Sequence, residues 1–315
     1  MKELALWKFV LENLTNKKPV IFMCVVESNG SSPGRQGFKM AVTEKELCGS
    51  IGGGIMEHKF VETAKEILRK QSEELIVKKQ IHSKNVSNNQ SGMICSGEQT
   101  LAVYPVKENH LIVIDKIVDA LERNLPITFQ FSAEGFSIIN NSESVPTKTF
   151  EQTADWKYSE RIGFVNYLHI IGGGHVSLAF SRLMHDLNFH ITVYDDREDL
   201  NTMQKNIYAH EKLFVNYENI HELIPDGNDF VVIMTFGYRT DGIVLRKLIH
   251  KEFRYLGLLG SKAKIDKMLQ ELKEEGIDEK IIKSIHAPVG IQINSQTPEE
   301  IAVSIAAEII KLKNS

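Results

Sequence analysis

The sequence predicts an α/β fold in which a C-terminal, Rossmann-like, doubly wound parallel sheet follows a smaller N-terminal α+β domain. Residues 168–199 carry most of this prediction, because an apolar strand, a glycine turn, an amphipathic helix and a second strand with an acidic end follow one another there, as in a mononucleotide-binding βαβ unit. Residues 229–234 form an almost unbroken apolar run, which is typical of a central parallel strand. The length of 315 residues leaves room for a second core.

The N-terminal half is predicted to combine helices with short strands. It opens with an amphipathic helix whose apolar face carries Leu4, Trp7, Leu11 and Leu14. Apolar, β-branched runs then alternate with turns rich in Gly, Ser, Asn and Pro, a pattern that favours strands. Strands are expected at residues 20–27, 38–42, 75–81, 99–106, 127–131 and 136–139, and helices at residues 55–70 and 112–124.

The C-terminal half is predicted to continue as alternating strands and helices. Thr297, Pro298 and Glu300 have the spacing of a capping box with a first-turn proline, so the last helix should start there. Further strands are expected at residues 212–215 and 253–259, and a helix at residues 242–251. Because residues 140–153 are rich in Ser, Asn, Thr and Glu, we expect an N-terminal domain over 1–107, a connecting region over 108–160 and the Rossmann-like domain over 161–315.

Two loops of the N-terminal domain are candidate cofactor-binding segments. Gly52, Gly53 and Gly54 precede a helix, where backbone N–H groups and the helix dipole favour an anion. The alternative is that these glycines only permit a tight turn. Arg35, in a loop rich in Gly, Ser and Pro, is suited to a bidentate phosphate contact. Glu57 lies in the first helical turn and is either a carboxylate of the site or a partner of the helix dipole.

The three cysteines differ in their surroundings. Cys95 stands between a polar run and a Ser-Gly turn, which is not typical of a core thiol, so it is a candidate ligand or nucleophile. Cys24 lies within a strand and is expected in the core, whereas Cys48 fits either class. An odd number of widely spaced cysteines favours free thiols in the cytoplasm over a disulfide framework. No C-x-x-C or H-x-x-x-H pattern occurs, so no structural zinc site is predicted.

The glycine turn of the C-terminal domain predicts a phosphate site. It consists of Gly172, Gly173 and Gly174. Such a turn brings backbone N–H groups close to a pyrophosphate at a helix start, although Ser177 replaces the third glycine of G-x-G-x-x-G. Asp195, with Asp196 beside it, ends the second strand and is placed to accept ribose hydroxyls. Asp195 would favour NAD over NADP, because it would repel a 2′-phosphate.

Four more residues of this domain are candidates. His175 follows the glycines and would either lie over the phosphate or reacting centre or simply begin the helix. Asp241 either caps its helix or serves the site. Gly260 and Ser261 follow a strand at a helix start, at the carboxyl edge where such folds bind ligands. No catalytic residue is assigned firmly, and the candidates are Cys95, His175 and Asp241.

Composition excludes some partners. A formal net charge of −4 gives no electrostatic reason to expect nucleic acid or an anionic membrane. No run approaches the roughly 20 apolar residues that cross a bilayer, and the N-terminal helix lacks the apolar core of a signal peptide. We therefore expect a cytoplasmic protein.

Six segments resemble the xanthine dehydrogenase accessory family, also called XdhC/CoxI. They read SNGSSPGRQGFKMAV, GSIGGGIMEH, MICSGE, LHIIGGGHVSLA with VYDDRED, YLGLLGSKAK, and HAPVGIQINSQTPEEIAVSIAAEI, and they span most of the chain. The resemblance implies an XdhC/CoxI-type N-terminal domain and an accessory protein, although many members carry the enzyme's name. Such a protein binds the molybdenum cofactor (molybdopterin), supports its sulfuration and delivers it to a xanthine dehydrogenase-type molybdenum hydroxylase of purine catabolism. A cysteine desulfurase is a second implied partner.

The resemblance also implies a role for Cys95. In the family, a cysteine in a C-G-G motif is linked to cofactor binding, so Cys95 would meet the cofactor and its molybdenum. Here Ser96 replaces the first of those glycines, and Phe236 stands where many members carry a histidine. A thiolate suits a soft, sulfur-bearing metal centre, and the glycine loops suit the phosphate of the cofactor.

Three functions are therefore compared. The first is a chaperone of the molybdenum cofactor. The second is an NAD(P)-dependent oxidoreductase, which the missing third glycine and the lack of an evident hydride-transfer set oppose. The third is a non-catalytic regulatory relative, which the departures at Ser96 and Phe236 keep open. Direct oxidation of xanthine is not expected, because the chain lacks a cysteine set for iron–sulfur clusters. A homodimer is expected only as the commonest oligomer.

Overall fold

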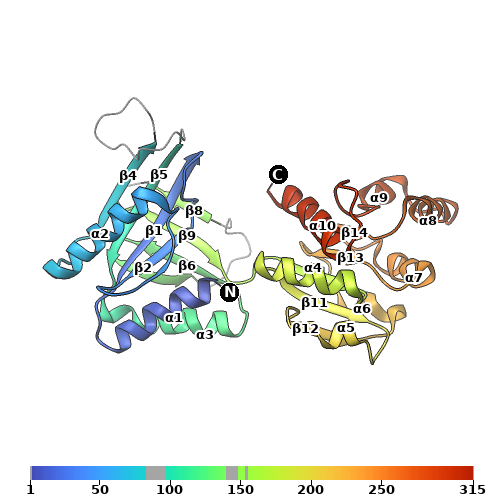
Figure 1. The fold of residues 1–315 in the computed structure, drawn as a ribbon, viewed down its shortest axis with the longest axis horizontal. Helices are drawn as coiled ribbons and strands as arrows, with labels where there is room; N and C mark the ends of the chain where they lie inside the picture. Colours follow the sequence, from blue (N-terminus) through green and yellow to red (C-terminus); the bar gives the residue numbers. More distant parts are fainter. Residues whose placement is uncertain (1, 83–96, 140–147, 153–154, 315) are drawn as a thin grey trace. The chain divides into compact units, whose positions relative to one another are not determined.

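The computed structural model describes residues 2–82, 97–139, 148–152 and 155–314. The chain forms two compact units, Met1–Gly163 and Phe164–Ser315 (Figure 1). We call them unit 1 and unit 2. Within the described ranges, no helix combines the length and the apolar character that a bilayer crossing requires.

Unit 1 is built on a five-stranded antiparallel sheet with the order β3-β2-β1-β5-β4. Its strands are β1 (Ile21–Gly30), β2 (Lys39–Val42), β3 (Leu47–Gly49), β4 (Ile76–His82) and β5 (Gly97–Pro105). The central strand β1 is apolar over its first six residues because both of its faces are covered there. Met23 and Val25 pack with helix α2 (Gly54–Lys70), whereas Phe22 and Cys24 belong to a second core on the other face.

The second core of unit 1 contains two helices and a second sheet. Helices α1 (Lys2–Thr15) and α3 (Leu111–Glu122) lie side by side (Figure 1). The antiparallel sheet β7-β6-β9-β8 consists of β6 (Ile127–Ser132), β7 (Gly135–Ile139), β8 (Lys148–Glu151) and β9 (Lys157–Ile162), and the short helix η1 (Glu108–His110) precedes α3. Trp7 is fully buried and its ring centroid lies 5.3 Å from that of Phe22 and 5.0 Å from that of Phe129.

The structure corrects the expected connecting region over residues 108–160. This segment supplies α3 and β6 to β9, whose apolar side chains share one core with α1 and β1. Only residues 140–147 and 153–154 within it lie outside the described part. Unit 1 therefore extends to Gly163 and is not the smaller of the two. The polar composition of residues 140–153 did not mark a boundary, because the strands on either side of it pair within the same sheet.

Unit 2 confirms the predicted Rossmann-like, doubly wound sheet. Its five parallel strands have the order β12-β11-β10-β13-β14. They are β10 (Tyr167–Ile171), β11 (His190–Asp195), β12 (Glu211–Phe214), β13 (Phe230–Ile233) and β14 (Tyr255–Leu258). All four residues of β13 are buried, as predicted for a central parallel strand.

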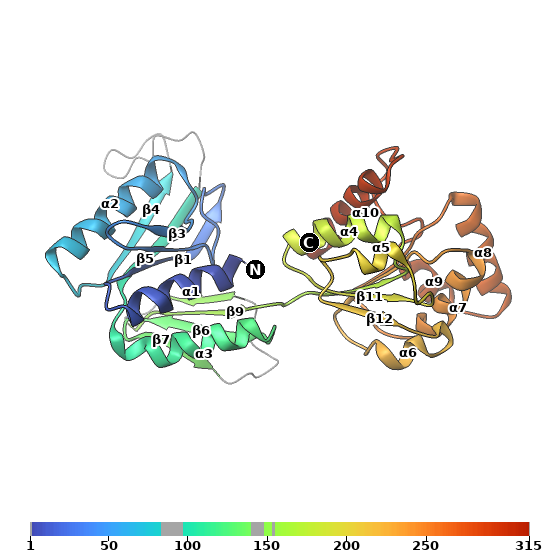
Figure 2. The ribbon, with the colours of Figure 1, turned by 60° about the horizontal axis from the view of Figure 1, so that its bottom comes forward.

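Helices cover both faces of this sheet. On one face lie α4 (His175–Asp186), the short α5 (Asn201–Gln204) and α10 (Pro298–Lys313). The other face packs against η2 (Tyr217–Asn219), α6 (Ile220–Leu223), α7 (Tyr238–Leu248), α8 (Lys262–Glu274) and α9 (Glu279–Ser284). Figure 2 shows α4 and α10 on the opposite side of the strands from α6. The expected helix 242–251 begins earlier, at Tyr238, because the Thr240 side chain accepts the Gly237 N–H group and caps the first turn.

The predicted start of α10 is confirmed in detail. Thr297 Oγ1 accepts the Glu300 N–H group at 3.2 Å, and Glu300 Oε2 accepts the Thr297 N–H group at 3.2 Å. Two donors that the helix itself cannot satisfy are thus paired. The interval between Thr297 and Glu300 was sufficient to place this helix end.

Three histidines stack at the end of the unit 2 sheet where its strands begin. The ring centroid of His210 lies 4.6 Å from that of His190 and 5.5 Å from that of His185. Phe164 covers the stack, with its centroid 4.6 Å from that of His210. His210 Nδ1 accepts the Ile191 N–H group at 3.0 Å. Burial, followed by the charges of the other two imidazoles, lowers the pKa of His210 from 6.5 to about 4.

Unit 2 is therefore expected to lose stability as the pH falls from 6.5 towards 4. In that range the unfolded chain binds a proton at His210 that the folded chain does not, so acid favours unfolding. His210→Gln keeps an acceptor for Ile191 and removes this titration. Thermal unfolding of both proteins between neutral and mildly acidic pH should show a steeper decline for the wild type. Parallel declines would contradict the assignment.

Candidate functional site

The N-terminal candidate loops meet at the end of the sheet where β1 ends and β5 begins. A Cβ atom on Gly34 would lie 2.2 Å from the carbonyl oxygen of Ile51, and one on Gly52 would lie 2.4 Å from the backbone nitrogen of Gly34. A Cβ atom on Gly97 would lie 2.5 Å from the carbonyl carbon of Ser31. Only glycine permits such close approach. The structure therefore joins the Arg35 loop, the glycine triplet and the start of β5.

Glu57 accepts the central N–H group of the glycine triplet, that of Gly53. Its Oε2 accepts the Ser50 hydroxyl at 2.7 Å and the N–H groups of Ile51 and Gly53, both at 2.9 Å. Burial alone would raise the pKa of Glu57, but these bonds outweigh it and lower the pKa. The Glu57 carboxylate thus binds donors of the loop before its own helix, and the Gly53 N–H group has a hydrogen-bond partner within the protein. Gly54 has a φ of 71°, which accounts for a glycine there without a ligand.

Arg35 and Gln99 complete this loop cluster. Arg35 is exposed, and its Nη1 donates to the carbonyl oxygen of Gly30 at 2.8 Å. Gln99 is buried, accepts the Gly34 N–H group at 3.0 Å and donates to Gln80 Oε1 at 2.9 Å. Sequence reasoning missed this glutamine pair, because only the pairing of β4 with β5 brings Gln80 opposite Gln99.

The structure describes two of the three cysteines, and they differ in burial. Cys95 and Ser96 lie outside the described residues. Cys24 is buried, and this burial raises the pKa of its thiol, in agreement with the predicted core position. Cys48 is partly exposed, and desolvation raises its pKa as well. Neither described thiol has the lowered pKa of a reactive cysteine.

The glycine turn of unit 2 packs tightly against the neighbouring strand. A Cβ atom on Gly172 would lie 2.2 Å from the carbonyl oxygen of Met234, and the φ of Gly172 is 112°. Ser177 is 1% exposed, and its hydroxyl has no hydrogen-bond partner among the described residues. The fold therefore accommodates serine at the third glycine position. A Cβ atom on Gly174 would meet nothing within 4 Å, so the mouth of the turn is open at that residue.

Asp195 is buried and hydrogen-bonded to this turn. Its side chain is fully buried, and Oδ2 accepts the Gly173 N–H group at 2.7 Å and Arg197 Nη2 at 2.8 Å. Oδ1 accepts the backbone N–H group of Arg197 at 2.9 Å and its Nε at 2.8 Å. Burial would raise the pKa of Asp195, but the bonds from Arg197 and Gly173 lower it. Asp196 is partly exposed, with Oδ1 4.0 Å from Arg197 Nε.

Asp241 is equally enclosed. Its Oδ1 accepts the N–H group of Thr235 at 2.9 Å and the hydroxyl of Thr235 at 2.6 Å, and Oδ2 pairs with the ammonium group of Lys264. Asp241 is therefore not the cap of its helix, because it lies within α7 and binds the loop before it. Sequence reasoning missed Lys264, which lies in α8, and no local pattern signals that pairing.

The remaining candidates lie near the helix starts. Ser261 Oγ accepts the Lys264 N–H group at 3.4 Å and caps α8, while a Cβ on Gly260 would lie 3.0 Å from the Lys264 side chain. His175 is exposed at the first residue of α4 and lines a groove of about 660 Å³ with residues of α4 and α10. Among the described residues, no group of three or more His, Cys, Asp or Glu side chains is arranged to hold a metal ion.

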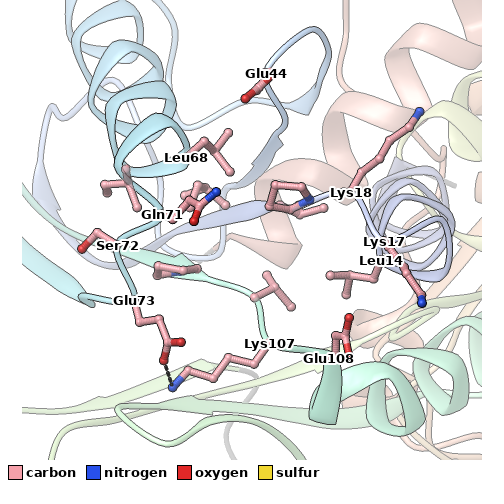
Figure 3. A pocket seen from close by; sticks show the side chains of 16 residues that line it. Leu14, Lys17, Lys18, Glu44, Leu68, Gln71, Ser72, Glu73, Lys107 and Glu108 are labelled. Atoms are coloured by element: carbon pink, nitrogen blue, oxygen red, sulfur yellow. Dashed lines mark ion pairs between the residues drawn. The ribbon is translucent and has the colours of Figure 1, made fainter.

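A pocket of about 460 Å³ lies in unit 1, away from the joined loops (Figure 3). Ile21, the first residue of β1, and Pro105, the last residue of β5, line it, whereas the loops follow the other ends of these strands. An ion pair between Lys107 and Glu73, 3.1 Å apart, crosses its rim. None of the candidate site residues from the sequence lines this pocket.

Two family models match the chain. The XdhC Rossmann domain matches residues 168–309, and the XdhC and CoxI family matches residues 14–78. Together they cover more than half of the chain, with one match in each unit.

Curated relatives and a solved structure agree with these matches. The chain is 27% identical over 303 residues to "Uncharacterized protein YqeB" of Escherichia coli, and this alignment covers 94% of this chain and 44% of that protein. It is 27% identical over 173 residues to a Bacillus subtilis protein named as a probable subunit of xanthine dehydrogenase, covering 52% and 48%. The alignments span less than half the length of both relatives. A crystal structure from Bacillus halodurans, described as a xanthine dehydrogenase, shares the fold with a TM-score of 0.74 at 24% identity, covering 97% and 95%.

Proposed function

Because the chain belongs to the XdhC and CoxI family, we propose that it is an accessory protein of a xanthine dehydrogenase-type molybdenum hydroxylase. In this role it binds the molybdenum cofactor as cargo, supports its sulfuration and delivers it to the enzyme, with a cysteine desulfurase as a further partner. The observation that carries the proposal is the family match in both units. The name of the Bacillus subtilis relative supports the choice of enzyme partner.

The joined loops of unit 1 provide groups that suit this cargo. Cys95 precedes Gly97 by two residues, and Gly97 packs against Ser31 in the joined loops. A thiolate at Cys95 would meet the soft, sulfur-bearing metal centre. Arg35 is an exposed cation of the same loops and is suited to the phosphate. Glu57 keeps the glycine triplet in shape through the bonds that its Oε2 accepts.

The alternative of an NAD(P)-dependent oxidoreductase has less support. Asp195 was expected to accept the ribose hydroxyls, but four donors already occupy its carboxylate. Asp241 was a candidate catalytic residue, but it is fully buried and paired with Lys264. His175 is exposed in a groove of α4 and α10.

The proposal is tested by purifying the protein without oxygen and titrating it with molybdenum cofactor and with NAD(H). Metal content and pterin fluorescence report the cargo. We expect stoichiometric binding of the cofactor, and Cys95→Ala should weaken it by about tenfold or more, the equivalent of one strong interaction. Cys48→Ala is the matched control, because it removes a partly exposed thiol elsewhere in unit 1.

The outcomes separate the three functions. Cofactor binding that depends on Cys95 and not on Cys48 supports the accessory role. Binding of NAD(H) alone would replace it with the oxidoreductase. A protein that binds neither ligand would be the non-catalytic relative, and the proposal would fall.

A further inference from the structure

The strongest unexplained feature of unit 2 is the complete saturation of Asp195. An ionised carboxylate has about four acceptor positions. Those of Asp195 face four donors at 2.7 to 2.9 Å, three of them from Arg197 and one from Gly173. The Asp195 side chain has no exposed surface. A ribose hydroxyl can therefore reach this carboxylate only if Arg197 first withdraws.

Arg197 forms the outer layer over this carboxylate. Its side chain is 38% exposed, and its guanidinium carbon lies 5.5 Å from the ring centroid of Phe236, which is 87% exposed. Within the described part of the chain, Nη1 of Arg197 makes no hydrogen bond. The guanidinium group thus turns two of its nitrogens inward and keeps one outer edge for another acceptor.

Helix α5, which follows the loop that carries Arg197, is also tied to the glycine turn. Thr202 Oγ1 donates to the carbonyl oxygen of Gly173 at 2.5 Å, and the Gly173 N–H group itself is held by Asp195. Hydrogen bonds therefore connect this segment to the glycine turn. A neighbouring carboxylate, Asp196, lies 4.0 Å from Arg197 Nε, beyond hydrogen-bond distance, and leaves the outer edge of Arg197 unoccupied.

We propose that Arg197 determines the ligand class of the glycine turn in unit 2. By holding Asp195, it rejects a free ribose diol, and with its outer edge it receives a phosphate ester. Planar guanidinium groups bind phosphate through paired N–H donors. The inference goes beyond the proposed function, because it concerns a phosphate ester bound by unit 2 and does not depend on the cofactor phosphate, for which Arg35 of unit 1 is suited.

NAD⁺ and NADP⁺ are a matched probe pair for this proposal, because they differ only by a phosphate on the ribose hydroxyl that a Rossmann-type acidic residue accepts. Isothermal titration of the full chain should show NADP⁺ binding about tenfold or more tightly than NAD⁺. In Arg197→Ala, Asp195 is released, so NAD⁺ should gain and NADP⁺ should lose affinity. Arg197→Lys keeps the charge without the two-pronged contact and should give an intermediate ratio.

Two controls protect the interpretation. Arg182→Ala removes an exposed arginine from α4 of the same unit and should leave the ratio unchanged. Thermal unfolding shows whether each variant is folded, and Arg197→Lys covers the case in which Arg197→Ala is not. The proposal is overturned if the wild type binds NAD⁺ at least as tightly as NADP⁺, if the ratio survives the loss of Arg197, or if no protein binds either probe. If the loss of Arg197 inverts the ratio of NADP⁺ to NAD⁺ affinity but the wild type does not bind the molybdenum cofactor, the role of Arg197 stands and the proposed function is rejected.

Discussion

Replacing Lys39 with alanine is expected to lower the free energy of unfolding of unit 1 by about 3–5 kcal/mol, because it leaves buried charge without its partner. The Lys39 side chain is 1% exposed, and its Nζ lies 2.5 Å from Glu160 Oε2 and 2.7 Å from Glu3 Oε1. It also donates to the carbonyl oxygen of Gly37 at 3.1 Å. Tyr158 donates to the same Glu160 carboxylate at 2.9 Å. Removal of the ammonium group therefore leaves several buried acceptors unsatisfied.

The same cluster makes unit 1 sensitive to acid. Burial alone would raise the pKa of Glu160, but Lys39 and Lys148 outweigh it and lower the pKa. A carboxylate with a lowered pKa stabilises the fold above its unfolded pKa, near 4.5, and this contribution is lost as the pH falls through the folded value. Burial likewise disfavours the Lys39 ammonium, but Glu160 and Glu3 raise its pKa above 10.5. The lysine contribution is therefore present throughout the neutral range.

Tryptophan fluorescence reports the unfolding of unit 1 selectively. The two tryptophans, Trp7 and Trp156, both belong to the core of unit 1. Urea unfolding should show the loss for Lys39→Ala, whereas Lys8→Ala, which breaks an exposed pair with Glu122, should change the stability by less than about 1 kcal/mol. The double variant Lys39→Met with Glu160→Gln removes both charges and should lose less than the two single changes together. Equal losses for Lys39→Ala and Lys8→Ala would refute the buried-pair argument.

Local patterns predicted most of unit 2 and two of the four strands in the second sheet of unit 1. The βαβ element depends on neighbouring segments, so strand, turn and helix signals were sufficient. Strands β8 and β9 were missed because β8 pairs with β9, and β9 pairs in turn with β6 across a polar segment. The strand expected at residues 38–42 forms as β2, but its pattern of burial was not predicted: Lys39 is buried and Phe38 is 40% exposed. Carboxylates distant in sequence decide the position of Lys39.

The candidate site residues were likewise predicted only in part from the sequence. Sequence spacing placed Glu57 beside one glycine loop and Asp195 beside the other, and both lie there. Whether a carboxylate faces a ligand or its own backbone depends on donor geometry, which spacing does not encode. Arg197, two residues beyond Asp195, turns back onto it. Cys95 stays a prediction, because it lies outside the described residues.

Asp241→Ala is expected to destabilise unit 2 by about 3–5 kcal/mol, because a fully buried carboxylate and its partners lose one another. The Asp241 side chain has no exposed surface, and that of Lys264 is 23% exposed. The change leaves the ammonium group of Lys264 and both donors of Thr235 without this acceptor. Since Asp241 joins the loop after β13 to α8, the loss should appear as faster amide exchange in α7 and α8.

Hydrogen exchange followed by mass spectrometry resolves those helices separately from unit 1. Asp241→Asn retains an oxygen for Thr235 and loses the ion pair with Lys264, so its exchange should fall between the wild type and Asp241→Ala. Lys247→Ala, which breaks an exposed pair with Glu218, is a control on the same helix and should change little. A catalytic or ligand-binding Asp241 predicts the opposite: Asp241→Ala would impair ligand binding while exchange in α7 and α8 stayed at the wild-type rate. The Asp241 side chain has no exposed surface and is paired with an internal cation. Because three internal donors already bind its carboxylate, these features favour the structural role.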